Sequence, residues 1–360
     1  MFLNTRMEKP VVSDKDIDCF IYIRKYDHIK EEKKHGINWL IHRVLHKCDP
    51  TGIIFTKYYE PFRNIELRPG STIKSKSDRR YTGKYNGINH YRIDDGFVNA
   101  MLRSDYYGVA VPYKATIPSG TEFYVNNGLF RIASRKIRIS KEKVATLPPL
   151  HETLRPILPV LLENLFGDST DVSPGFYYMS DGTYSNPNTT PKENLQNVCG
   201  IVSGVDGNKL TIMSLDEQQM PWCVSEETTR VCSDRDLEAS GDDVMLTVMR
   251  NENYGDDFVP ARWCSKYEYQ GGPRGSWHMG SVGEVISAVR ENMLQINLAI
   301  AQLGDQYKLL DCLSRYWTNV DAEDDYAYVI DGVDGTLIRC HKKWTELNVR
   351  PFMTKMRYYV

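Results

Sequence analysis

The chain has 360 residues, of which 41% are hydrophobic and 26% are charged, as is typical of a globular protein in water. It contains no run of about 18 apolar residues, which excludes an obvious transmembrane helix. Met1–Asp18 carries charges throughout, so a secretion signal is not expected. The cysteines form no C-x-x-C pair, and without such a signal we expect reduced thiols.

Charge is distributed unevenly, although the net charge is only −2. Residues 1–150 contain 27 Lys and Arg against 16 Asp and Glu, a net charge of +11. Residues 151–360 contain 18 against 31, a net charge of −13. This asymmetry predicts that the two halves face different partners, and two independently solvated surfaces are the alternative.

The beginning of the chain contains two predicted strands. Asp18–Tyr26 and Ile53–Tyr59 are rich in β-branched and aromatic residues, which favour strands. The periodicity of Ile37–His46 fits a short helix or a strand equally well. No metal site is expected, because the following residues match no zinc-ligand spacing: His35, His42, His46 and Cys48.

Lys74–Arg92 mixes basic residues with tyrosines, a combination that can follow a phosphate backbone while aromatic rings stack on bases. However, no helix-turn-helix, zinc-finger or RNA-binding motif surrounds it. We therefore expect an exposed basic loop that contacts an acidic protein neighbour, and nucleic acid is the less favoured partner.

Gly96–Ile139 alternates apolar and polar residues, which predicts two or three strands. Turn signals lie at Pro118-Ser119-Gly120 and Asn126-Asn127-Gly128. Thr146–Gly167 then forms a connector whose prolines exclude a regular long helix before Val160. It is too apolar for a free linker, so we expect it to be buried between domains or, preferably, between subunits.

The last third of the chain carries the strongest local signals. Ser281 precedes Glu284 by three positions, the capping-box arrangement at the start of a helix. Apolar residues recur at helical spacing as far as Leu303, and Gly304 ends the helix.

Two strands are predicted after this helix. Tyr326–Ile330 and Thr336–Cys340 are separated by Asp-Gly turn signals. One helix packed on short antiparallel strands with long loops is an α+β arrangement. The predicted fold class is therefore α+β, with a β-rich N-terminal region.

Several short motifs follow one another in the second half of the chain: D-G-T-Y-S (Asp181–Ser185), G-I-V (Gly200–Val202), M-S-L-D-E…W (Met213–Trp222), G-S-W-H-M-G-S-V-G-E-V (Gly275–Val285), Y-W-T-N (Tyr316–Asn319), A-Y-V-I-D-G-V-D-G (Ala327–Gly335) and V-R-P-F (Val349–Phe352). In this order they resemble the C-type-lectin-like module found in surface proteins of gut Bacteroidetes and their phages. Gly96–Ile139 resembles a small β-module that occurs beside this domain in the same proteins. The sequence departs from the family at His278-Met279-Gly280, where the family has an apolar residue, Leu and Pro, and at Thr318-Asn319, where it has Ser-Ser.

The resemblance implies four regions: a basic docking region at 1–90, a small β-module at 91–145, a Pro-rich connector at 146–167 and a C-type-lectin-like domain at 168–360. A lectin-type unit that closes on itself also requires Tyr326–Ile330 and Val349–Phe352 to lie in one sheet.

Catalytic residues and cofactors are not expected. Formylglycine-generating enzymes share the lectin-like fold and need a pair of copper-binding cysteines, but their sequence context is absent around Cys312 and Cys340. No other common catalytic or phosphate-binding motif occurs. The E-P-N or Q-P-D and W-N-D triplets of calcium-dependent sugar binding are also absent, and Asp321–Asp325 is expected to be a solvated acidic loop and not a calcium site.

Any recognition of glycans is expected to use exposed aromatic side chains and polar residues of the long loops. Most of the aromatic candidates also fit a hydrophobic core. The candidates are Trp222, Trp263, Tyr267, Tyr269, Trp277 and Asn319.

The leading hypothesis is a structural virion protein, similar to the head or tail fibres or decoration proteins of crAss-like phages and made in the host cytoplasm. The basic first half would dock on capsid or other virion proteins, and the lectin-like half would bind host-surface glycans or simply cap the fibre. We expect a homo-dimer or homo-trimer and no membrane partner. A bacterial carbohydrate-binding protein of the same fold and an enzyme of the formylglycine-generating type are the alternatives.

Overall fold

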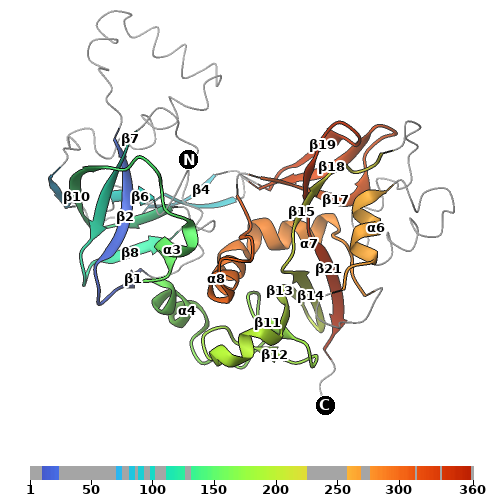
Figure 1. The fold of residues 1–360 in the computed structure, drawn as a ribbon, viewed down its shortest axis with the longest axis horizontal. Coiled ribbons are helices and arrows are strands. Elements are labelled where there is room, and N and C mark those ends of the chain that lie inside the picture. The colour runs from blue at the N-terminus through green and yellow to red at the C-terminus, as the bar shows by residue number, and fades with distance from the viewer. Residues whose placement is uncertain are drawn as a thin grey trace, which may run out of the picture. The chain divides into compact units, whose positions relative to one another are not determined.

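The computed structural model describes residues 10–23, 70–74, 81–85, 88–92, 98–101, 111–125, 131–224, 258–268, 276–312, 314–332 and 335–357. The chain divides into two compact units, Met1–Val160 and Leu161–Val360. It is rich in strands and has a few helices, in agreement with the coarse α+β prediction (Figure 1). The predictions for Ile37–His46, for Ile53–Tyr59 and for the nearby His and Cys residues lie outside the described residues.

An eight-stranded antiparallel sheet organises the first unit, in the order β1-β8-β9-β6-β2-β7-β10-β3. Within it, β2 (Ile17–Ile23) pairs with β7 (Val111–Ile117) along its whole length. Strands from both of the predicted segments, 1–90 and 91–145, therefore hydrogen-bond in one sheet. The other strands are β1 (Val11–Val12), β3 (Thr72–Lys74), β6 (Val98–Met101), β8 (Glu122–Val125), β9 (Arg131–Ser134) and β10 (Lys136–Lys143), and a separate hairpin joins β4 (Tyr81–Tyr85) to β5 (Ile88–Arg92).

The alternating pattern of Gly96–Ile139 produces strands, as predicted, but more of them. Tyr113, Ala115 and Ile117 of β7 are buried and Lys114 is exposed, which is the period of two that a strand requires. The predicted turn after β7 is present, and Gly120 adopts a φ of +70° there. The second predicted turn lies outside the described residues.

The Pro-rich connector forms two short helices, α3 (Leu150–Leu154) and α4 (Leu158–Phe166). Pro149 occupies the N-cap position of α3 and Pro159 lies in the first turn of α4, where a missing backbone N–H costs no helical hydrogen bond. The predicted burial of the apolar side chains is confirmed, but it occurs within the chain itself and does not require the subunit contact that was the preferred explanation: Leu150, Leu154, Ile157, Leu161, Leu162 and Phe166.

Two sheets organise the second unit. The six-stranded sheet has the order β12-β11-β13-β14-β21-β16, and the five-stranded sheet has the order β15-β20-β17-β18-β19. The first consists of β11 (Tyr177–Met179), β12 (Tyr184–Ser185), β13 (Val198–Asp206), β14 (Lys209–Ser214), β16 (His278–Met279) and β21 (Pro351–Met356). The second consists of β15 (Gln218–Met220), β17 (Arg315–Asp321), β18 (Tyr326–Asp331), β19 (Leu337–His341) and β20 (Leu347–Val349).

The predicted capping box is confirmed at the start of the long helical segment. Ser281 Oγ accepts from the Glu284 amide, and the Glu284 carboxylate accepts from the Ser281 amide. α7 (Val282–Ile286) packs on β17 and β18, whereas α8 (Met293–Leu303) packs on β13 and ends at Gly304, as predicted. The segment therefore connects the two sheets. The remaining described helices of this unit are the 3₁₀ helix η2 (Lys192–Asn197) and α6 (Val259–Ser265).

One continuous helix was the expectation, and this is wrong. A π-helical turn, η4 (Ser287–Glu291), separates α7 from α8. The Ser287 hydroxyl and the Asn292 side-chain amide both donate to the carbonyl of Ser203, at 3.0 and 2.9 Å. Ser203 lies at a register shift of β13. The π-helical turn therefore coincides with hydrogen bonds to the six-stranded sheet.

The terminal V-R-P-F segment is divided between the two sheets. β20 ends at Val349 in the five-stranded sheet, which also contains β18, whereas β21 begins at Pro351 in the six-stranded sheet. The prediction that Val349–Phe352 lies in the same sheet as Tyr326–Ile330 is therefore confirmed for Val349 and wrong for Pro351 and Phe352. Both sheets nevertheless belong to one compact unit.

Candidate binding surface

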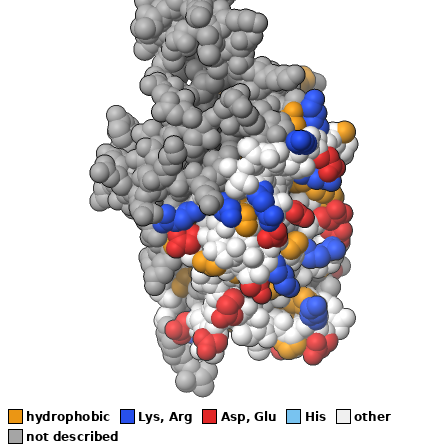
Figure 2. Space-filling model, turned by 90° about the vertical axis from the view of Figure 1, so that its left-hand side faces the viewer, with side chains coloured by type: hydrophobic (Ala, Val, Ile, Leu, Met, Phe, Trp, Pro, Cys, Tyr) orange, Lys and Arg blue, Asp and Glu red, His pale blue; other side chains and the backbone are white. Residues whose placement is uncertain are grey.

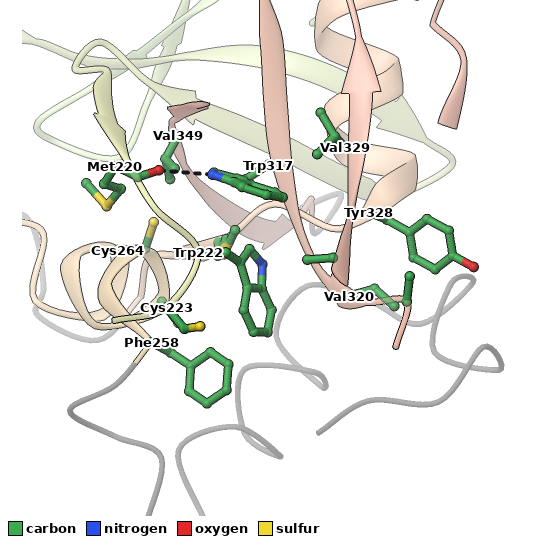
Figure 3. Packing of buried hydrophobic residues seen from close by; sticks show 14 residues of the cluster. Met220, Trp222, Cys223, Phe258, Cys264, Trp317, Val320, Tyr328, Val329 and Val349 are labelled. Carbon is green, nitrogen blue, oxygen red and sulfur yellow. Dashed lines mark hydrogen bonds between the residues drawn. The ribbon is translucent and has the colours of Figure 1, made fainter. Parts of the chain in front are cut away.

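Two of the predicted ligand residues lie in the hydrophobic core of the five-stranded sheet. Trp222 is only 1% exposed and packs edge-on against Phe258, with ring centroids 4.6 Å apart (Figure 3). Its indole N–H donates to the carbonyl of Thr318 at 2.9 Å. Asn319 on β17 is also buried. The expected exposure of Trp222 is therefore wrong, and the alternative position in a hydrophobic core is confirmed for it.

Three further candidates form one aromatic cluster. The Trp263 and Tyr267 rings are 5.8 Å apart, and the Tyr267 and Trp277 rings 5.2 Å apart, both in edge-on contact. Tyr267 and Trp277 are buried, so their expected exposure is also wrong, and Trp263 is half-buried. Such edge-on packing is typical of a core. Tyr269 lies outside the described residues.

The entry to α7 contains a buried hydrogen-bonded pair of side chains, His278 and Glu284. His278 Nε2 lies 3.0 Å from both carboxylate oxygens of Glu284, and both side chains are buried. Burial raises the pKa of Glu284. The hydrogen bond and charge of His278 and the hydrogen bonds of Ser281 lower it by more, so the pKa lies below its ordinary value. This pair fixes the entry to the helix and stabilises the fold.

A buried cation contacts the loop between β17 and β18. Lys342 is 1% exposed, and its ammonium lies 3.1 Å from Asp321 Oδ2, 2.8 Å from the carbonyl of Asp324 and 5.0 Å from the ring centroid of Trp222. The Lys342 backbone donates to the carbonyl of Asp325 and accepts from the amide of Trp222. Lys342 thus joins the acidic loop to the core.

The acidic run Asp321–Asp325 is engaged by cations of the chain itself. Asp321 pairs with Lys342, and Glu323 pairs with Arg339. In the part of the chain that the structure describes, no group of three or more His, Cys, Asp or Glu side chains is arranged to hold a metal ion. Burial raises the pKa of the half-buried Cys340 thiol, which lowers its thiolate fraction.

Among the described residues of the second unit, the exposed aromatic side chains Tyr326 and Trp344 lie with the half-buried His341 next to Lys342. We call Tyr326, His341 and Trp344 the aromatic ridge. Trp344, in the turn after β19, is 75% exposed, and Tyr326, at the start of β18, is 39% exposed. The Tyr326 and His341 rings are 5.5 Å apart at an interplanar angle of 67°, and the His341 and Trp344 rings are 5.9 Å apart at 49°.

Sequence reasoning missed all three members of the ridge. A signal was present, because Trp344 stands in the polar run H-K-K-W-T-E, where an apolar side chain has few apolar neighbours to cover it. Composition alone does not separate this tryptophan from Trp222 or Trp277.

The first unit was expected to provide a basic docking surface. On the face shown in Figure 2, Lys and Arg side chains are interspersed with Asp and Glu side chains over the described surface. Three basic residues of this unit are in ion pairs: Lys114 with Glu142, Arg135 with Glu122 and Arg138 with Asp16. Much of the basic sequence, including residues 24–50, lies outside the described residues.

Among the described residues, no helix combines the length and the apolar character needed to cross a bilayer. No protein-family model matches the chain, and no curated protein matches it. The crystal structure of a fimbrial protein from Bacteroides ovatus is similar to part of it, with a TM-score of 0.43 and 14% identity. That similarity covers 51% of this chain and 49% of the fimbrial protein, so the chain spans about half the length of its structural neighbour.

Proposed function

We propose that the chain is a structural attachment protein of a virion, a head or tail fibre or decoration protein of a tailed phage, whose C-terminal unit contacts the host surface. The observation that carries the attachment role is Trp344, which is 75% exposed although buried Lys342 fixes the backbone of its turn. An exposed aromatic side chain on an ordered backbone offers a large contact area, and such residues are enriched at binding surfaces.

The buried charged residues support a binding role over catalysis. Glu217 and Asp321 are each paired with a cation of the same unit, and Glu284 is hydrogen-bonded to His278, so these carboxylates stabilise the fold. The C-type-lectin-like assignment of this unit and the phage assignment rest on the order of the sequence motifs. The basic charge of residues 1–150 supports docking on other virion proteins, and a dimer or trimer suits a fibre.

Two measurements test the proposal. Mass spectrometry of purified phage particles asks whether the chain is a virion component, and we expect it to be present. Fluorescently labelled full-length chain is then incubated with Bacteroidetes cells, and we expect binding that Trp344→Ala reduces. Val205→Ala is the matched control, because Val205 is an exposed apolar residue of the other sheet.

Each outcome separates the candidate functions. Presence in particles together with cell binding supports a virion attachment protein. Cell binding by a chain that is absent from particles would instead indicate the bacterial carbohydrate-binding alternative. A chain that is absent from particles and does not bind to cells would reject the proposal.

A further inference from the structure

We infer that the aromatic ridge is a stacking site for a neutral sugar ring. This inference deepens the proposed attachment function and rests on it. It assigns both the residues that make the contact and the chemical class of the ligand.

The geometry of the ridge fits a pyranose ring. Successive rings are inclined at 67° and 49°, so they form an angular surface and not one flat sheet. A pyranose presents C–H groups on one face and hydroxyl groups around its rim. The exposed indole of Trp344 can receive the C–H face, while the Tyr326 hydroxyl and the His341 imidazole supply hydrogen-bonding groups beside it.

The surroundings of the ridge favour a sugar over an apolar partner. Charged side chains of both signs lie next to it, since Lys343 Nζ is 5.3 Å from the centroid of the Trp344 ring and Glu323 pairs with Arg339. A lipid surface or an amphipathic helix needs a wider continuous apolar patch. A few aromatic rings with polar groups around them are what a small hydroxylated ligand requires.

The charge balance around the ridge favours a neutral sugar. Asp324 and Asp325 directly precede Tyr326, and Glu346 follows Trp344 by two positions, and all three are exposed. Lys343 is the basic residue next to Trp344, and nearby Arg339 is already paired with Glu323. A uronic or sialic acid would therefore meet net negative charge, whereas the hydroxyl groups of a neutral sugar can donate to these carboxylates.

The ridge is organised before any ligand binds. Lys342 holds its loop through Asp321, Asp324 and Asp325, and the Lys343 amide donates to His341 Nδ1 at 3.2 Å. Because these contacts already order the backbone, binding loses less conformational entropy than binding to a free loop would.

The test uses the full chain and a printed array of neutral and acidic oligosaccharides. Titration calorimetry then measures the dissociation constant of the neutral oligosaccharide with the strongest signal. We expect Trp344→Ala to weaken binding at least about tenfold, Tyr326→Ala to weaken it less, and Trp344→Phe to retain part of the affinity. Met356→Ala is the control, because Met356 is 54% exposed on β21 and should leave binding unchanged.

Thermal unfolding of each variant shows that a loss of binding is not a loss of folding, since the Trp344 side chain is mostly exposed. Unchanged affinity of Trp344→Ala would overturn the site, and binding of acidic glycans alone would overturn the ligand class. Cell binding without glycan binding would overturn the sugar inference and leave the attachment function standing. Loss of both would reject the function itself.

Discussion

Arg350 Nε donates to Glu217 Oε2 across 2.9 Å, and these two residues, whose side chains are buried, occupy two of the places where the chain passes between the sheets of the C-terminal unit. Glu217 lies between β14 and β15, and Arg350 lies between β20 and β21. The Arg350 guanidinium also donates to the carbonyls of Ser214 and Leu215. One ion pair therefore holds both crossings together, which gives the V-R-P-F motif a structural role.

Arg350→Met is expected to lower the free energy of unfolding by about 3 kcal/mol, because Glu217 keeps only the half-exposed Lys308 as a partner. The matched control is Arg339→Met, whose ion pair with Glu323 is exposed and contributes at most about 1 kcal/mol. Urea denaturation followed by tryptophan fluorescence measures both. Equal losses in the two variants would contradict the role assigned to the crossing pair.

Gly280→Ala is expected to destabilise the fold by about 1–3 kcal/mol through overpacking. A Cβ at this position would lie 2.6 Å from the buried ring of Phe352 and 2.9 Å from Val285 Cγ2. Gly283→Ala serves as the counterpart, because a Cβ there meets nothing within 4 Å and α7 should gain about 0.5–1 kcal/mol. Thermal unfolding should therefore shift in opposite directions for the two variants, and a shift in the same direction would refute this account.

The stabilisation by Glu284 is expected to depend on pH. Its pKa in the folded chain lies below its ordinary value of 4.5, so the unfolded chain binds the proton first as the pH falls. The contribution is complete above pH 4.5 and is lost as the pH falls through the lower, folded pKa. The difference in unfolding free energy between the wild type and Glu284→Gln should therefore shrink in acid. Urea denaturation from about pH 7 to about pH 3 measures it, and parallel pH curves would disprove the linkage.

Lys342→Met is expected to cost about 3–5 kcal/mol, because it leaves the Asp321 carboxylate buried without its ammonium partner. Adding Asp321→Asn removes that uncompensated charge and should restore part of the loss. A double-mutant cycle by urea denaturation gives the coupling free energy. Additive effects would show that the two side chains do not stabilise each other.

The predictions that succeeded depend on residues close together in the sequence. The capping box at Ser281, the helix end at Gly304 and the hairpin of β18 and β19 are determined by local hydrogen bonding and turn geometry. These features do not require knowledge of which strands pair across the unit.

The features that were missed depend on distant contacts. The interruption before Asn292 involves the carbonyl of Ser203, and the division at Arg350 depends on the pairing of β21 with β14 and of β20 with β17. Trp222 is buried because Phe258 and Lys342 pack on it, whereas Trp344 lies in a turn where little covers it. Residue type alone does not distinguish these environments.

The buried Lys342 ammonium orders the loop beside the aromatic ridge through its contacts with Asp321, the Asp324 carbonyl and the Trp222 ring. The side chains at positions 343 and 344 are not among these supports. Substitutions at positions 343 and 344 can therefore change the chemistry of this exposed surface without disturbing the buried contacts of Lys342.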